Sequence, residues 1–118
     1  MGATWSVTTT VDPRRRRVAV HGEFDLCAED PFVDELEAVL SDGVDEAWLD
    51  FTDCGFFDSS GLRAILRLRT GHPNRVKLIA ASPFVRHVLQ ISGLADLLVE
   101  PADDERNDAD RVLPAQRQ

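Results

Sequence analysis

Two hydrophobic patterns follow one another at the start of the chain, and both predict strands. Residues 5–11 are rich in Val and Thr, which favour extended backbone, and predict a first strand. Residues 17–24 alternate apolar with polar side chains, as in a strand with one buried face. Asp12 and Pro13 lie between these segments and predict a turn, so the chain is expected to open with a hairpin.

A helix and a buried strand are predicted next. Pro31 suits the first turn of a helix, and Asp30 is a suitable cap before it. Apolar residues then recur at helical spacing and define the buried stripe: Phe32, Leu36, Val39 and Leu40. Gly43 follows where a C-terminal glycine is expected. The apolar density of residues 47–51 predicts a third strand that is buried on both faces.

The second half of the chain continues this alternation. Residues 60–70 predict a second helix, and residues 76–81 predict a fourth strand. The apolar stripe expected on the helix consists of Leu62, Ile65 and Leu66. Away from that stripe the helix carries three arginines: Arg63, Arg67 and Arg69.

Ser82 and Pro83 predict the cap and first turn of a third helix, which is expected to end at Gly93. Its buried side is formed by Val85, Val88 and Leu89. Residues 97–99 predict a short last strand. The predicted order is β-β-α-β-α-β-α-β, which indicates an α/β fold with a mixed β-sheet and helices packed mainly on one side.

Composition divides the chain into one domain, residues 1–100, and a tail, residues 101–118. Six carboxylates lie between Glu100 and Asp110, and the segment has almost no apolar residues before Val112. Such a segment forms either a frayed helix or a disordered tail, and its polarity favours the tail.

Length and charge narrow the function classes. A chain of 118 residues with 43% hydrophobic residues fits one packed domain. The net charge of −8 opposes nucleic-acid binding, which needs clustered Lys and Arg. The one basic run, residues 14–17, predicts either a small anion-binding patch or a solvated turn, and its place after Pro13 favours the turn. No apolar run is long enough to span a membrane and no signal peptide is recognisable, so the predicted location is the cytoplasm.

Cysteine and histidine patterns give no support for a metal site. Cys27 and Cys54 form no CxxC motif and have no histidine at ligand spacing, so we expect buried or half-buried free thiols. His21, His72 and His87 are scattered as single residues and are predicted to lie at the surface or at an edge.

The segment most informative about function is residues 49–62, in which an apolar strand leads through a short loop to a helix. The loop ends in Asp58-Ser59-Ser60-Gly61. A serine at a helix start has its hydroxyl close to free backbone N–H groups and to the positive end of the helix dipole, and both favour an added phosphate. The alternative is that Asp and Ser only cap the helix.

Three segments together resemble the STAS family: Gly22-Glu23-Phe24-Asp25, then Asp58-Ser59-Ser60-Gly61-Leu62, and finally Ser82-Pro83-Phe84-Val85-Arg86 with Ile91-Ser92-Gly93-Leu94. The resemblance covers roughly residues 5–100 and implies a STAS-like sheet. Bacterial single-domain members are anti-sigma factor antagonists, in which a serine at the position of Ser59 is phosphorylated by the partner.

The resemblance therefore implies a phosphorylation switch in transcription signalling. The unphosphorylated protein would bind an anti-sigma factor with serine kinase activity and so release a sigma factor. Phosphorylation at Ser59 would end that binding, and a partner phosphatase would restore it. A phosphate adds about −1.5 to −2 charge, which an interface adapted to a neutral hydroxyl would repel.

Further residues around Ser59 are candidate partner contacts. Asp25 and Asp58 both follow strand ends and are expected at the same end of the sheet. There they orient the Ser59 hydroxyl, or meet a basic surface on the partner, or serve only as turn and cap residues. Ser60 belongs to the same motif. Gly61 either allows the close approach of another backbone or a nucleotide, or only tolerates the loop's dihedrals. Arg63 stands where many relatives have a small residue and is expected to enlarge the positive face of the helix.

Intrinsic catalysis is not expected. Ser59 does not lie in a G-x-S-x-G elbow, no histidine is placed to activate it, and the chain has no G-x-x-x-x-G-K-[ST] motif. Ser59 is therefore predicted to be a substrate, with no catalytic residue, cofactor or metal in the chain. Two alternatives remain: a STAS subunit of a signalling scaffold or lipid-transport complex, and a sensor whose Ser59 loop binds a small molecule or nucleotide.

Overall fold

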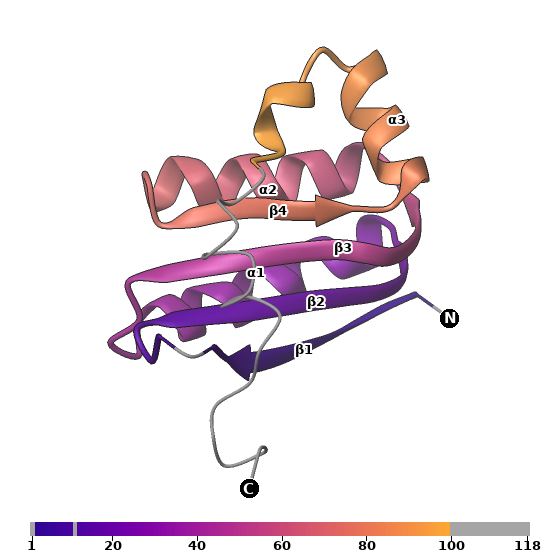
Figure 1. Cartoon of the computed structure of the whole chain (residues 1–118). Coiled ribbons are helices and arrows are strands. Elements are labelled where there is room, and N and C mark those ends of the chain that lie inside the picture. The colour runs from indigo at the N-terminus through magenta and orange to yellow at the C-terminus, as the bar shows by residue number, and fades with distance from the viewer. Residues whose placement is uncertain (1, 11, 100–118) are drawn as a thin grey trace, which may run out of the picture.

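A single mixed sheet forms the centre of the computed structural model, which describes residues 2–10 and 12–99 (Figure 1). The strand order is β1-β2-β3-β4. β1 (Ala3–Thr9) pairs antiparallel with β2 (Arg15–Phe24). β2 pairs parallel with β3 (Glu46–Phe57), and β3 pairs parallel with β4 (Val76–Ala81).

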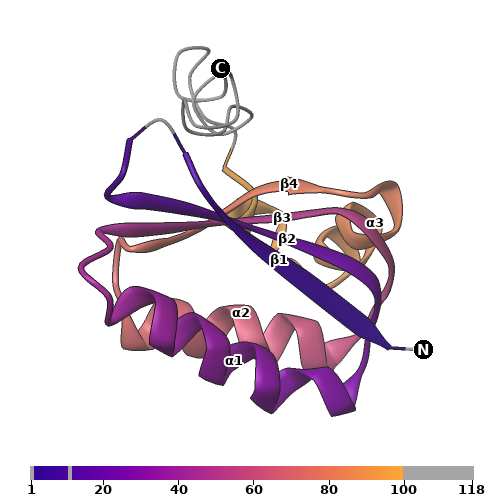
Figure 2. The same ribbon diagram turned by 90° about the horizontal axis from the view of Figure 1, so that it is seen from below.

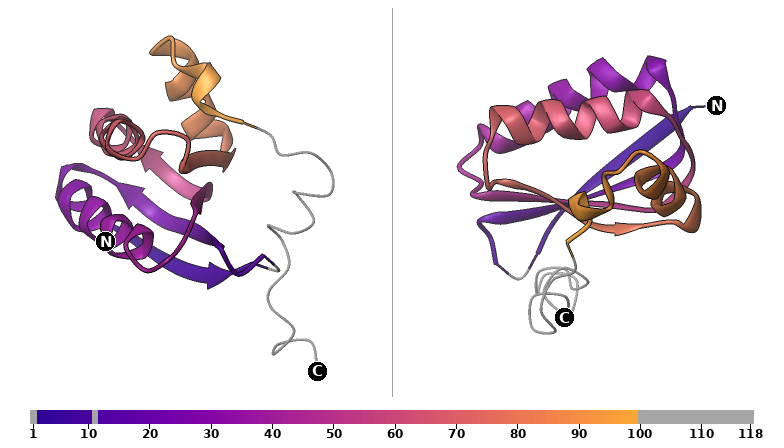
Figure 3. Two further views of the ribbon diagram at one scale, coloured as in Figure 1. Left: turned by 90° about the vertical axis from the view of Figure 1, so that its left-hand side faces the viewer. Right: turned by 90° about the horizontal axis from the view of Figure 1, so that it is seen from above.

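Two helices cover one face of this sheet. α1 (Leu26–Leu40) connects β2 to β3, and α2 (Ser59–Gly71) connects β3 to β4. The parallel strands follow one another across the sheet in one direction, so right-handed crossovers carry both helices to the same face. Figure 2 and the right-hand view of Figure 3 show α1 and α2 side by side on that face. The predicted α/β fold with helices mainly on one side is therefore confirmed.

The last predicted strand is wrong. After α3 (Pro83–Ile91), which lies at the end of the sheet where β3 and β4 finish (Figure 1), the chain forms a 3₁₀ turn, Ala95–Leu97. Turn hydrogen bonds from Leu97 N to Leu94 O (3.0 Å) and from Leu98 N to Ala95 O (3.2 Å) take the place of a regular strand, although Val99 N donates to Leu78 O of β4 (2.8 Å). Only Leu98 forms a bridge, with Leu78 of β4. The predicted tail, residues 101–118, lies outside the described residues.

The start of α1 also differs from the prediction. Asp25, not Asp30, is its N-cap, and the Asp25 carboxylate accepts a hydrogen bond from Cys27 N (3.0 Å). Pro31 lies inside the helix, where it cannot donate to the carbonyl of Cys27. Cys27 and Pro31 are both exposed, so solvent can reach that carbonyl. The helix therefore tolerates a proline that the sequence pattern assigns to its first turn.

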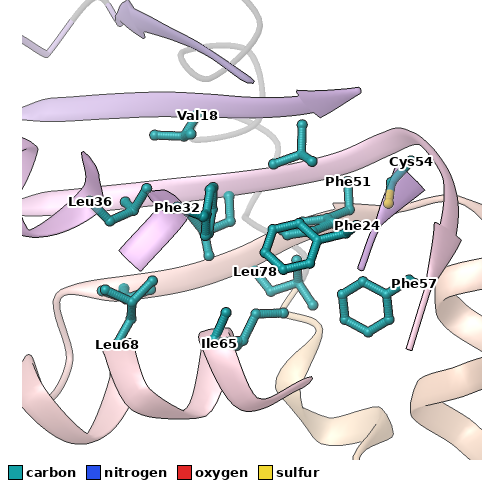
Figure 4. Packing of buried hydrophobic residues seen from close by; sticks show 14 of the residues in the cluster. Val18, Phe24, Phe32, Leu36, Phe51, Cys54, Phe57, Ile65, Leu68 and Leu78 are labelled. Carbon is teal, nitrogen blue, oxygen red and sulfur yellow. The ribbon is translucent and has the colours of Figure 1, made fainter. Parts of the chain in front are cut away.

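The core lies between the sheet and these two helices. Four phenylalanines form its centre, with ring centroids 5.3 Å apart for Phe24 and Phe32 and 5.4 Å apart for Phe51 and Phe57. Such edge-on contacts are favourable for aromatic rings. Figure 4 shows Ile65 of α2 on the helix side of this group.

The predicted buried stripes are only partly correct. In α1, Phe32, Leu36 and Leu40 are buried and Val39 is half-buried. In α2 the buried side consists of Ser60, Gly61, Ala64, Ile65 and Leu68. The predicted Leu62 is only half-buried, and Leu66 is 39% exposed. α2 is thus turned so that two leucines remain at the surface.

The basic run is not a solvated turn, because only Arg14 of the four arginines lies in the turn. Arg15 belongs to β2 and has its guanidinium 3.9 Å from the centre of the Trp48 ring. Arg17 pairs with Asp50 of β3. These contacts lie on the sheet face opposite α1 and α2, and they anchor the arginines to neighbouring strands.

The cysteines and histidines follow the predictions in part. Both thiols are free, Cys54 being buried, but Cys27 is exposed rather than half-buried. His72 is half-buried at the C-terminal end of α2: its side chain is 17% exposed and its Nε2 lies 2.7 Å from Glu37 Oε1. Within residues 2–10 and 12–99, no group of His, Cys, Asp or Glu is arranged to hold a metal ion. In the same residues, no helix has the length and apolar character needed to cross a membrane.

Candidate functional site

The site lies where β2 and β3 end side by side. Phe24 of β2 is paired with Phe57 of β3, and Asp25 and Asp58 are the next residues of their strands. The prediction that both aspartates lie at the same end of the sheet is therefore correct. Each one caps the helix that follows it: Asp25 caps α1 and Asp58 caps α2. The capping role considered for them is thus observed.

Ser59 is the first residue of α2 and is exposed. The prediction that the helix begins at Ser60 is wrong by one residue. The Asp58 carboxylate accepts a hydrogen bond from Ser60 N (2.8 Å), and the Asp58 carbonyl accepts from Gly61 N (3.0 Å) and Leu62 N (3.3 Å). Asp58 therefore occupies N–H groups that were expected to be free for a phosphate, and the site has an exposed hydroxyl but few free backbone donors.

Ser60 and Gly61 point into the protein. Ser60 is 3% exposed, and Gly61 is buried. A Cβ atom on Gly61 would lie 2.3 Å from Cε2 of Phe57. The glycine is required because the Phe57 ring fills the space beside it, which is neither of the two reasons considered from the sequence. Ser60 and Gly61 are thus buried in the unbound protein, and their contact with a partner stays a prediction.

Arg63 does not form a free positive surface. Its guanidinium donates to both carboxylate oxygens of Glu29 on α1, with Nε 2.9 Å from Oε1 and 3.0 Å from Oε2. Arg67 Nη1 lies 2.9 Å from Glu29 Oε2 and 2.8 Å from Asp30 Oδ1. These four residues form an ion cluster between α1 and α2. Half of the Arg63 side chain is exposed, so it still borders the Ser59 surface.

Glu29 is the residue that the sequence analysis missed. It is 6% exposed, and the hydrogen bonds from Arg63, partly opposed by burial, hold the pKa of its carboxyl below the usual 4.5. If the helix is taken to begin after Asp25, the helical spacing places Glu29 on its buried side. With α1 beginning at Leu26, Glu29 precedes Phe32 by three residues and shares its buried side.

The Glu29 pairing predicts a pH dependence of stability. A carboxyl whose pKa is lower in the folded state stabilises the fold above its unfolded pKa, and this contribution is lost as the pH falls through the folded pKa. We expect Glu29→Gln to be less stable than the wild type at neutral pH, with the difference shrinking as the pH falls from about 5 to about 3. Urea unfolding over this range measures it, and the exposed Glu35→Gln is the control. A constant difference would contradict the role of Glu29.

Asp50, on the sheet face opposite α1 and α2, also makes the folded state more stable at neutral pH than at acidic pH, because its pKa is lowered. Burial by itself would raise the pKa of Asp50, but hydrogen bonds from Thr52 and the charge of Arg17 outweigh burial and lower it. Because Asp50 is unchanged in both Glu29→Gln and Glu35→Gln, its titration cancels when the two variants are compared. The comparison therefore isolates Glu29.

An apolar groove runs along α2 from Ser59. Its volume is about 680 Å³, and its apolar lining consists mainly of Leu62, Leu66 and Leu94. Arg63 and Arg67 lie along it as well.

Two aromatic side chains near Ser59 are also exposed. Phe56, three residues before Ser59, is 40% exposed, and Phe84 of α3 is 44% exposed, with ring centroids 5.8 Å apart. Exposed apolar surface of this kind, rimmed by charge, is typical of a protein-binding site.

A domain with this sheet order, and with an exposed serine at the start of α2, matches a known family. The family model described as "Mlab, STAS domain" matches residues 7–100. The chain therefore belongs to the STAS domain family. No curated protein sequence matches it significantly.

Solved structures similar to this chain are anti-sigma factor antagonists. The unphosphorylated form of the antagonist SpoIIAA is 27% identical, with a TM-score of 0.69, over 89% of this chain and 94% of SpoIIAA. The phosphorylated form of the Bacillus cell fate determinant SpoIIAA is 26% identical, with a TM-score of 0.64, over 92% of this chain and 100% of that chain. An antagonist from Mycobacterium paratuberculosis shares the fold at 21% identity, with a TM-score of 0.73, over 91% of this chain and 92% of that chain. The chain thus resembles STAS domains of the anti-sigma factor antagonist type.

Proposed function

We propose that this protein is an anti-sigma factor antagonist controlled by phosphorylation of Ser59. Unmodified, it binds an anti-sigma factor that has serine kinase activity, and a sigma factor is released. The observation that carries the proposal is the exposed Ser59 hydroxyl, which lies at the start of α2 and borders the apolar groove. The likeness to SpoIIAA, solved in unphosphorylated and phosphorylated forms, supports it.

The groove supplies the contact area in this proposal. Leu62, Leu66 and Leu94 would be buried against an apolar segment of the anti-sigma factor, with the Ser59 hydroxyl at the rim. Phosphorylation brings about −1.5 to −2 charge to a position next to the Asp58 carboxylate. An interface adapted to a neutral hydroxyl must then desolvate this charge, which is costly, so the complex dissociates. A partner phosphatase reverses the change.

Ser59 acts as a substrate rather than as a nucleophile in this account. Activation of a serine requires a base within hydrogen-bond reach. Two of the three histidines have other partners: Nε2 of His72 lies against Glu37, and Nδ1 of His21 lies 3.4 Å from Asp53. In this proposal the kinase and phosphatase activities belong to the partners, which act with this protein in the cytoplasm.

The first test is the site of modification. Candidate anti-sigma kinases of the source organism, purified one at a time, are incubated with the protein and ATP. We expect one phosphate, on Ser59, because Ser59 is exposed whereas Ser60 is 3% exposed. Tandem mass spectrometry locates it, and Ser60→Ala should still be modified while Ser59→Ala should not. A phosphate on Ser60, or on Ser59→Ala at an unchanged level, would contradict the assignment.

Two other outcomes would replace the proposal. Co-purification with a transporter ATPase, without any kinase, would favour a STAS subunit of a larger assembly. A rise in melting temperature with a nucleotide or small anion, without covalent change, would favour a sensor. Both experiments use the same purified protein, so they can accompany the kinase assay.

A further inference from the structure

We propose that Arg63 is the internal binding partner of phosphorylated Ser59. On modification its guanidinium moves from the Glu29 carboxylate to the phosphate on the same helix. This inference rests on the proposed phosphorylation of Ser59, and it states how the modified form is stabilised.

The helix brings the two residues together. Ser59 and Arg63 are four residues apart in α2, and residues with this spacing lie on the same side of a helix, one turn apart. Side chains on a helix lean toward its N-terminus, so a change of rotamer can bring the guanidinium of Arg63 from Glu29 to the turn that carries Ser59. Both residues line the same groove, and half of the Arg63 side chain is exposed. The guanidinium is therefore accessible from the solvent in which a phosphate would lie.

A phosphate on Ser59 needs such a cation because the helix start offers little else. Asp58 already accepts hydrogen bonds from the N–H groups of Ser60, Gly61 and Leu62. Its carboxylate also repels a second anion. Arginine binds phosphate through two parallel N–H groups, a geometry that a single backbone donor does not provide.

The exchange leaves Glu29 paired. A buried carboxylate that lost its only cation would be strongly destabilised. Glu29 has two: when Arg63 leaves, Arg67 Nη1 remains 2.9 Å from Glu29 Oε2. Arg67 is in turn held by Asp30. Arg63 can therefore leave the cluster while Arg67 still neutralises the buried Glu29 carboxylate.

The exchange would also carry the signal from α2 to α1. Arg63 links the two helices only while it binds Glu29, so the modified form has one ion pair fewer between them. The phosphate charge is partly neutralised within the chain, which keeps the fold intact. A partner that binds near Glu29 would sense the change without touching Ser59.

The test uses the full chain with phosphoserine encoded genetically at position 59, so no kinase is needed. Phosphorus NMR follows the second ionisation of the phosphate, whose usual pKa is about 6. A nearby guanidinium favours the doubly charged form, so we expect this pKa to be higher in Arg63→Gln than in the wild type by about 0.5 unit or more. Arg69→Gln, on the same helix, should leave it unchanged, because Arg69 contacts the Val76 carbonyl instead. Glu29→Gln, which releases Arg63, should lower it.

A second readout guards against misfolded variants. The Arg63 Nε–H signal in the ¹⁵N spectrum should move when the phosphate is present, and Arg63→Lys should restore only part of the pKa difference. An equal phosphate pKa in wild type and Arg63→Gln, or an equal effect of Arg69→Gln, would overturn the proposal. Because the phosphate is installed independently, this result does not depend on whether a kinase modifies Ser59, and the kinase assay tests that point separately.

Discussion

Phosphorylated protein is expected to lose binding to its anti-sigma factor, and Ser59→Asp is expected to reproduce part of that loss. One carboxylate carries less charge than a phosphate, so we expect Ser59→Asp to weaken binding by about 1–3 kcal/mol, or roughly 5- to 150-fold. Phosphorylation of Ser59 should reduce the affinity more than Ser59→Asp does. Ser59→Ala should bind as the wild type does, because it removes a hydroxyl at the rim and adds no charge. Titration calorimetry measures all four forms.

The matched control places the same charge elsewhere. Ser41 is an exposed serine directly after the last residue of α1, at the opposite end of that helix from Asp25. Ser41→Asp should leave the affinity unchanged, so a loss with Ser59→Asp cannot come from net charge alone. Equal affinities for wild type, Ser59→Ala and Ser59→Asp would contradict the proposal that charge at this helix start controls binding.

Gly61→Ala is expected to destabilise the fold although alanine is the better helix former. The added Cβ would lie 2.3 Å from the Phe57 ring, which is itself buried in the aromatic core. Overpacking of this kind costs about 1–3 kcal/mol, against a gain of about 1 kcal/mol in helix propensity. We therefore expect a net loss of stability, which urea unfolding with an unchanged m-value would measure.

Two further variants identify the Phe57 ring as the cause. Gly71, the last residue of α2, has nothing within 4 Å of its Cβ position, so Gly71→Ala should be neutral or stabilising. Phe57→Leu leaves a cavity of its own but relieves the clash, so its effect and that of Gly61→Ala should be less than additive. Additive losses, or a Gly61→Ala protein as stable as the wild type, would contradict this explanation.

The fold is predicted well where the hydrophobic periodicity of a segment and the capping or turn residues at its ends indicate the same element. The fourth strand is observed over Val76–Ala81, as predicted, and Ser82 caps α3 by accepting from Val85 N at 3.2 Å. In both cases periodicity and end signals indicate the same boundaries. α1 was predicted less well because two aspartates compete as caps, and Pro31 favours the wrong one. In the structure Asp25 is the cap, and Ala28 and Glu29, which follow it in the first turn, are buried.

The site could be predicted only in part. The position of Ser59 at a helix start follows from the order of strand, loop and helix. The pairing of Phe24 with Phe57 explains why Asp25 and Asp58 lie at the same end of the sheet. Arg63 and Glu29, by contrast, are 34 residues apart, and their contact depends on how α1 and α2 pack. The role of Gly61 depends on the rotamer of Phe57. Neither feature leaves a periodic signal in the sequence.

In the proposed mechanism Ser59 controls binding through local charge and not through refolding. The most direct test measures anti-sigma factor affinity and melting temperature on one sample before phosphorylation, after it, and after phosphatase treatment. We predict that affinity is lost and then regained, while the melting temperature stays nearly constant, because a gain of about 0.3–1 kcal/mol from the helix dipole offsets repulsion by Asp58. A phosphorylated protein that binds as tightly as the unmodified one, or that melts at a much lower temperature, would contradict the account.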